Sequence, residues 1–160
     1  MIRRCVDTEF RTIESVINEA AEAYRGVIPD DCWHDPYMSA SALQAEIAFG
    51  VEFWGWDEAG ALLGIMGTQH VRDANLIRHA YVRTVHQSKG IGGALLSFLV
   101  EQNPGPLLVG TWAAAEWAIR FYQRHGFRLV SPAEKDQLLT AYWDIPARQK
   151  ETSVVLEYVR

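Results

Sequence analysis

The chain has 160 residues, of which 49% are hydrophobic and 22% charged, and its formal net charge is −5. These values are typical of one globular domain, here residues 1–160, and they exclude a disordered or fibrous chain. The acidic balance disfavours nucleic acid as a partner. We find neither a signal peptide nor a run of about 18 apolar residues, so we expect a cytoplasmic protein that has no membrane partner.

The first fifty residues predict a strand over 2–6, a helix from 7 or 8 to about 24, an irregular segment over 26–38, and a helix from 39 or 41 to about 50. Apolar residues at helical spacing indicate the first helix, and Asp7 or Thr8 can cap it. Ser39 or Ser41 can cap the second helix. The prolines and aspartates between the two helices break regular structure and mark a candidate substrate loop.

Three strands are expected next, over 51–56, 62–71 and 76–85, because these segments are rich in β-branched and aromatic residues. The turn residues at 57–60 and 72–75 separate them. Such short turns predict an antiparallel meander.

A glycine-rich turn, a helix over 90–102 and an apolar strand over 107–112 follow the meander. A strand, a helix and a second strand in this order usually form a right-handed crossover between parallel strands. We therefore expect the strands over 76–85 and 107–112 to be parallel.

The rest of the chain predicts a helix over 114–125, a strand over 127–130, an inserted helix from 131 to 142 or 143, and a final strand over 153–159. Gly126 suits the position after a helix cap. Ser131 and Glu134 form a capping box, and Pro132 stands at the first helical position.

The segment from Gln87 to Ala94 carries the most chemical information. It reads Gln-Ser-Lys-Gly-Ile-Gly-Gly-Ala and joins a predicted strand to a predicted helix. Glycines let backbone N–H groups approach a ligand, and a helix start adds unpaired donors and a positive dipole end. A pyrophosphate fits such a segment, although the glycine run taken alone is more often a tight turn that binds nothing. NAD and ATP are disfavoured, because the segment lacks a complete dinucleotide fingerprint and a P-loop.

Two motifs in this order resemble the GNAT superfamily of N-acetyltransferases. One is the phosphate motif Gln/Arg-x-x-Gly-x-Gly/Ala, here Gln87-x-x-Gly90-x-Gly92, and the other is Ala-x-x-Phe-Tyr-x-x-x-Gly-Phe, here residues 118–127. The resemblance covers nearly the whole chain, with the helix after Ser131 as an addition. It implies an α/β (α+β) fold, in which helices flank a central mixed, mostly antiparallel sheet of about seven strands with a parallel crossover at the acetyl-CoA site.

The same resemblance implies roles for individual residues. The segment whose amides would hold the coenzyme A pyrophosphate comprises Gln87, Ser88, Lys89, Gly90, Ile91, Gly92, Gly93 and Ala94. Backbone groups of Tyr81, Val82 and Arg83 would pair with pantetheine. Tyr122 would protonate the departing thiolate as the general acid, since a phenol with a pKa near 10 is a reasonable donor; its alternative is a purely packing role. Where the family often has an asparagine that contacts the coenzyme, this chain has Ala115.

The motifs do not assign a general base. Glu116 starts the helix over 114–125, and His79 lies on the strand that usually supplies the base in the family, so both are candidates. Each also has an ordinary explanation, as an acid near a helix N-terminus and as a core or surface histidine.

Four residues are candidates for acceptor binding. Asp30 and Asp31 can hold a cationic amine, although an acidic pair after proline is also typical of a solvated turn. Trp33 and Trp112 can form an aromatic wall around an amine, whereas most of the six tryptophans are expected in the core. Trp112 ends a strand beside the point where the resemblance implies that two parallel strands separate.

We therefore expect an acetyl-CoA-dependent N-acetyltransferase that acts on a primary amine of a small molecule or peptide, by direct attack in a ternary complex. A relay through Cys5 or Cys32 is disfavoured, because neither lies near the motifs. No metal is expected, since the cysteines and the five histidines lack ligand spacings. Two alternatives stay open: a catalytically silent acyl-CoA-binding module, and a homodimeric interaction module that uses exposed aromatic residues.

Overall fold

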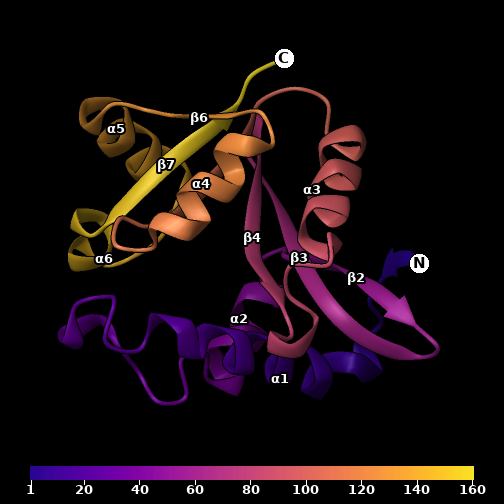
Figure 1. Ribbon diagram of the computed structural model, residues 1–160. Coiled ribbons are helices and arrows are strands. Elements are labelled where there is room, and N and C mark those ends of the chain that lie inside the picture. Colours follow the sequence, from indigo (N-terminus) through magenta and orange to yellow (C-terminus); the bar gives the residue numbers. More distant parts are fainter.

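The computed structural model describes residues 1–160 and contains a seven-stranded sheet of order β1-β2-β3-β4-β5-β7-β6 (Figure 1). The strands are β1 (Ile2–Arg4), β2 (Glu52–Glu58), β3 (Ala61–Val71), β4 (Ala74–Val82), β5 (Leu107–Trp112), β6 (Phe127–Leu129) and β7 (Ser153–Tyr158). Only β4 and β5 pair in parallel, and all other neighbours are antiparallel. The predicted fold, a mixed and mostly antiparallel sheet with one parallel crossover, is confirmed.

Six α-helices and four short 3₁₀ segments connect the strands. The α-helices are α1 (Phe10–Ala20), α2 (Ala40–Ala48), α3 (Ile91–Gln102), α4 (Glu116–Arg124), α5 (Pro132–Tyr142) and α6 (Ala147–Glu151). The 3₁₀ segments are Asp7–Glu9, Ala21–Tyr24, Asp30–Cys32 and Thr84–His86. None of the helices combines the length and the apolar character that crossing a bilayer would need.

Helices cover both faces of the sheet, because successive side chains on a strand point to opposite faces. On β3, Met66 packs with α3 and α4, whereas Ile65 packs with α1 and α2. On β5, Val109 belongs to the same cluster as Met66, whereas Leu108 contacts α5. The helices α3 and α4 therefore lie on one face, and α1, α2 and α5 lie on the other.

Two predicted caps are confirmed. The Ser39 hydroxyl accepts a hydrogen bond from the N–H of Ala42 at 3.1 Å, so α2 begins after Ser39 rather than Ser41. The Ser131 hydroxyl accepts from the N–H of Glu134 at 3.2 Å at the start of the inserted helix α5. Each side chain satisfies a backbone donor that the helix itself leaves unpaired.

The predicted cap at Asp7 or Thr8 is wrong, because the chain enters the first helix through a 3₁₀ turn over Asp7–Glu9 and α1 begins only at Phe10. Two further differences lie at the end of β4 and around α6. β4 ends at Val82 rather than at residue 85, because Thr84–His86 turns into a 3₁₀ segment. α6 was not predicted, since it has five residues, follows Pro146 and shows no apolar periodicity. α6 and the end of β4 both lie beside the cavity described below.

Candidate active site

The turn between β4 and α3 presents a row of backbone donors that have no partner within the chain. Gly90 caps α3 with a left-handed φ of 84°, and no side chain caps this end of the helix. The N–H of Ala94 donates to the Gly90 carbonyl at 3.0 Å, whereas the N–H groups of residues 88–93 donate to no loop carbonyl and no side chain. Unpaired N–H groups at a helix start attract anions. This segment, which we call the cradle, fits a pyrophosphate.

Gly93 cannot carry a side chain where it stands. A Cβ at this position would lie 2.7 Å from Nε2 of His125. The His125 imidazole is fixed, because its Nδ1–H donates to the Phe121 carbonyl at 2.8 Å and its ring packs on that of Phe121 at 4.7 Å between centroids. α4 thus packs directly against the backbone of the cradle.

The parallel strands separate close to the cradle. β4 and β5 pair at only three positions, the last of which is Ile77 with Val109. The edge of β4 that faces β5 therefore has no strand partner beyond Ile77. On the edge that faces β3, β4 contains a bulge: Ile65 pairs with Tyr81 and Gly67 with Arg78, so β4 has one more residue than β3 between these pairs. His79 lies in this bulge and has a left-handed φ of 54°. Such a conformation is strained for a residue other than glycine and is often found at functional sites.

A cavity of about 580 Å³ opens where these strands separate. It is lined by β4, β5, the cradle, α4 and two further segments, near residues 24–37 and 143–153. The predicted site residues that line it are His79, Tyr81, Val82, Gln87, Ser88, Gly90, Ile91, Gly92, Gly93, Trp112 and Tyr122. The predicted site residues outside the lining are Asp30, Asp31, Trp33, Arg83, Lys89, Ala94 and Glu116.

Tyr122 on α4 is buried between the edges of two aromatic rings, Phe121 at 5.2 Å and Phe127 at 5.6 Å between centroids. Its hydroxyl has no hydrogen-bond partner in the protein and is not among the fully enclosed polar atoms, so it is open to the cavity. Burial raises the pKa of this phenol well above its ordinary value. Tyr122 therefore stays protonated at neutral pH and remains able to donate a proton.

Residues 14–141 match the family model described as an acetyltransferase (GNAT) domain. The chain belongs to the GNAT acetyltransferase family. It is 29% identical over 90 residues to the peptidyl-lysine N-acetyltransferase YiaC of Escherichia coli K12, a match that covers 56% of this chain and 59% of that protein.

Two solved structures show the same fold as this GNAT protein. One is a GNAT acetyltransferase from Staphylococcus aureus Mu50, with a TM-score of 0.72, 16% identity, and coverage of 99% of this chain and 97% of the other. The other is the PaiA N-acetyltransferase of Thermoplasma acidophilum in complex with coenzyme A, with a TM-score of 0.72, 17% identity, and coverage of 100% and 98%.

The two candidate bases of this GNAT protein have very different surroundings. The carboxylate of Glu116 is 78% exposed and lies 3.8 Å from the Arg120 guanidinium, away from the cavity. His79 is 12% exposed and lines the cavity, and its Nε2 lies 2.8 Å from the Glu46 carboxylate. Arg78 contacts the same carboxylate. Since a carboxylate accepts, His79 donates to Glu46 through Nε2–H, and its Nδ1 has no hydrogen-bond partner in the protein.

The candidate acceptor residues of the irregular loop lie behind the cavity wall. Asp31 accepts from the Arg148 guanidinium at 2.8 Å, which holds the pKa of its carboxyl below the usual range. Trp33 packs beneath the Arg25 guanidinium at 4.6 Å, and its buried Nε1–H has no partner. Trp112, in contrast, lines the cavity, and its Nε1–H donates to the Tyr37 hydroxyl at 2.7 Å.

Neither cysteine lines this cavity, and Cys32 packs in the same buried cluster as the lining residues Tyr24 and Trp112. Both are free thiols, and Cys32 is buried. Burial raises the pKa of the Cys5 thiol to about 11, so it is protonated at neutral pH. The prediction of a mechanism without a cysteine relay agrees with this geometry but stays a prediction.

Sequence reasoning did not name four site residues that line the cavity, Tyr24, Tyr37, Trp143 and Gln149, nor Glu46, which does not line the cavity but contacts His79. Tyr37 belongs to the predicted substrate loop, so its aromatic type was the available signal. Glu46 and Gln149 come from α2 and α6, whose positions beside β4 and β7 depend on contacts over long stretches of sequence.

Proposed function

We propose that this protein is an N-acetyltransferase that transfers an acetyl group from acetyl-CoA to a primary amine by direct attack in a ternary complex. The observation that carries this proposal is the run of unpaired N–H groups over residues 88–93, which opens into a cavity where two parallel strands separate. Family membership and the peptidyl-lysine N-acetyltransferase activity in the name of the E. coli relative support it. That relative matches over only 59% of its length, so its acceptor is not transferred to this chain.

The proposed coenzyme site uses backbone groups. The N–H groups of the cradle would hold the pyrophosphate through charge-assisted hydrogen bonds of about 1.5–3 kcal/mol each, before the cost of association. The Gln87 side chain, whose Nε2 donates to the Val82 carbonyl at 3.1 Å, fixes the turn. The free edge of β4 beyond Ile77 would pair with the amides of pantetheine, as an unpaired strand edge pairs with any extended chain. Tyr81 and Val82 belong to this edge, whereas Arg83 follows the end of β4 and its N–H donates to the Leu63 carbonyl of β3 at 2.8 Å.

The proposed chemistry needs a neutral amine and a protonated acid. Acetyl-CoA supplies an activated carbonyl, the amine nitrogen forms the new C–N bond, and the C–S bond breaks. Tyr122 would give its phenolic proton to the departing sulfur, and its raised pKa keeps that proton available. His79 would take a proton from the amine at Nδ1, while Glu46 holds Nε2–H and so sets the tautomer. Glu116 is the less favoured base, because its carboxylate lies outside the cavity lining.

The test is release of free coenzyme A thiol from acetyl-CoA in the presence of primary amines. The Tyr122→Phe variant should lose about 10²- to 10⁴-fold in kcat and keep its affinity for acetyl-CoA. Tyr158→Phe is the matched control, because Tyr158 packs on Phe127 at 5.3 Å outside the cavity. Full turnover by Tyr122→Phe would contradict its role as the acid. Binding of acetyl-CoA without transfer to any amine would instead favour a catalytically silent acyl-CoA-binding module.

A further inference from the structure

Two segments far apart in the sequence form the wall of the cavity opposite the cradle. Tyr24 and Tyr37 come from the segment after α1, and Trp143, Ile145 and Gln149 come from the segment around α6. Trp143 reaches the wall because Gly110 has no side chain: a Cβ there would lie 3.3 Å from the indole. This half of the cavity also touches α4, because Tyr24 stacks on Trp117.

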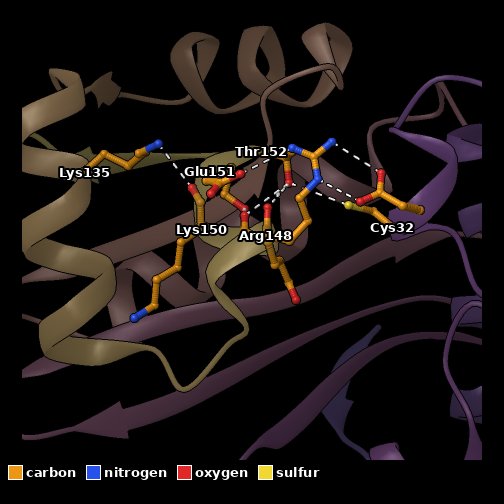
Figure 2. A network of polar contacts seen from close by, with 9 residues as sticks. Cys32, Lys135, Arg148, Lys150, Glu151 and Thr152 are labelled. Carbon is orange, nitrogen blue, oxygen red and sulfur yellow. Dashed lines mark hydrogen bonds and ion pairs between the residues drawn. The ribbon is translucent and has the colours of Figure 1, made fainter.

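Polar contacts fix these two segments to each other, as Figure 2 shows around α6. The Arg148 guanidinium donates to both oxygens of Asp31, at 2.8 and 3.3 Å. The Thr152 hydroxyl lies 4.0 Å from the Cys32 sulfur. The wall is therefore held as one unit, and the charges that hold it lie outside the cavity lining.

The cavity offers no free carboxylate to a cation. None of its 34 lining residues is aspartate or glutamate. Two carboxylates near the wall are already paired, Asp31 with Arg148 and Glu46 with Arg78 and His79. Asp30 and Asp144 are exposed and do not line the cavity. A second ammonium group on an acceptor would therefore lose its hydration without gaining an ion pair, which is costly in a low-dielectric site.

The same part of the cavity offers no free cation to an acceptor carboxylate. The two terminal nitrogens of Arg78 donate to Gln69 and to Glu46. His79 also lines this part of the cavity and is paired with Glu46. The remaining histidine and arginine lining residues, His86, Arg124 and His125, belong to the cradle side, next to α3 or at the end of α4.

Uncharged polar groups and aromatic rings remain for recognition. The Tyr37 hydroxyl accepts from Trp112 and keeps its own proton to donate. The Gln149 carbonyl of the backbone accepts from the Ser153 hydroxyl at 2.6 Å, whereas the Gln149 side-chain amide has no partner in the protein and lines the cavity. Tyr24 stacks on Trp117 at 5.9 Å between centroids, with an angle of 25° between the rings.

From this lining we infer that, if the proposed transferase function holds, the acceptor is a small primary monoamine whose remaining part is uncharged and bears an aromatic ring. The ring lies against the aromatic wall of Tyr24, Tyr37 and Trp143, and the Gln149 amide oxygen accepts an N–H of the amine. Polyamines and free amino acids are rejected, because each would bury a charge that has no partner.

Matched pairs of amines test the acceptor class through the rate of thiol release. The value of kcat/KM for 2-phenylethylamine should be at least about tenfold higher than that for phenylalanine. Likewise, kcat/KM for butylamine should be at least about tenfold higher than that for 1,4-diaminobutane, since an unpaired buried charge costs more than 1.4 kcal/mol. 2-Phenylethylamine should also exceed butylamine. Equal or reversed preference within either charged pair overturns the inference, and so does a capped lysine peptide that is acetylated faster than 2-phenylethylamine.

The variant Gln149→Leu tests the site itself. It should raise KM for 2-phenylethylamine about tenfold and leave KM for acetyl-CoA unchanged, because the lost contact involves the acceptor alone. Gln137→Leu is the matched control, since Gln137 is exposed on α5 and does not line the cavity. An unchanged acceptor KM in Gln149→Leu overturns the assignment of this residue. If the wild-type protein does not bind acetyl-CoA, the proposed function fails; if it binds but prefers charged acceptors, only the present inference fails.

Discussion

The cradle makes a quantitative prediction that separates charge from bulk. An ideal Cβ at Gly92 would lie 3.4 Å from the Phe121 ring and 3.7 Å from Val82, so a side chain fits with little adjustment. In Gly92→Glu, a carboxylate about 5 Å from a phosphate charge costs about 3 kcal/mol at an effective dielectric constant of about 20, or roughly 150-fold in affinity. Gly92→Gln has nearly the same volume and no charge, so the ratio of the two dissociation constants isolates the electrostatic part.

Calorimetric titration of acetyl-CoA into both variants measures this ratio. Both should stay folded, because a glutamate in the first turn of a helix stabilises it by about 0.3–1 kcal/mol through the helix dipole. The ratio should shrink at about 1 M salt, where the Debye length falls to about 3 Å. Equal affinities for Gly92→Glu and Gly92→Gln, in well-folded protein at low salt, would refute a phosphate group at the cradle.

Three further predictions concern the strands and loops around the cavity. Gly67→Ala should destabilise the fold by about 1–3 kcal/mol in urea unfolding, since its Cβ would lie 2.9 Å from the Arg78 carbonyl oxygen at the bulge of β4; an unchanged midpoint would show that the bulge yields freely. Burial opposes ionisation of Glu46, but the contacts with His79 and Arg78 outweigh burial and lower the pKa of this carboxyl. The ionised Glu46 therefore contributes its full stabilisation above the ordinary pKa of about 4.5, and this stabilisation is lost as the pH falls through the lowered pKa. The acid limb of the stability curve should therefore flatten in Glu46→Gln, and a parallel limb would contradict this coupling. Arg148→Ala should leave the melting temperature nearly unchanged, because the Arg148–Asp31 ion pair that it breaks is about half exposed. The variant should nevertheless raise the acceptor KM, because the wall becomes looser. A large drop in melting temperature would show that this ion pair is structural.

Local patterns carried most of the fold prediction. The caps at Ser39 and Ser131 and the strand over 107–112 depend on residues adjacent in sequence, and the structure confirms them. The end of β4 and the helix α6 were not predicted, because neither has a local pattern that sets it apart from a turn. Packing against the rest of the molecule decides these features, and a single sequence does not display that packing.

The site residues likewise fall into those that local sequence predicted and those that only the fold reveals. Residues 87–94 are contiguous, so their spacing together with the family resemblance predicted an anion site, and their unpaired N–H groups agree with it. The pairing of His79 with Glu46 joins β4 to α2 across 33 residues, and the contact of Trp112 with Tyr37 spans 75 residues. Residue type made His79 and Trp112 candidates, but only the folded chain shows which groups orient them.

This division has a consequence for how the protein tolerates change. The cradle consists of backbone donors on one short segment that α4 packs against, so we expect substitutions there to act on the proposed coenzyme binding and on α4 together. The opposite wall consists of side chains from two segments that touch each other mainly through exposed polar contacts. If this wall binds the acceptor as we propose, substitutions in it should change the KM for the amine while the KM for acetyl-CoA stays constant.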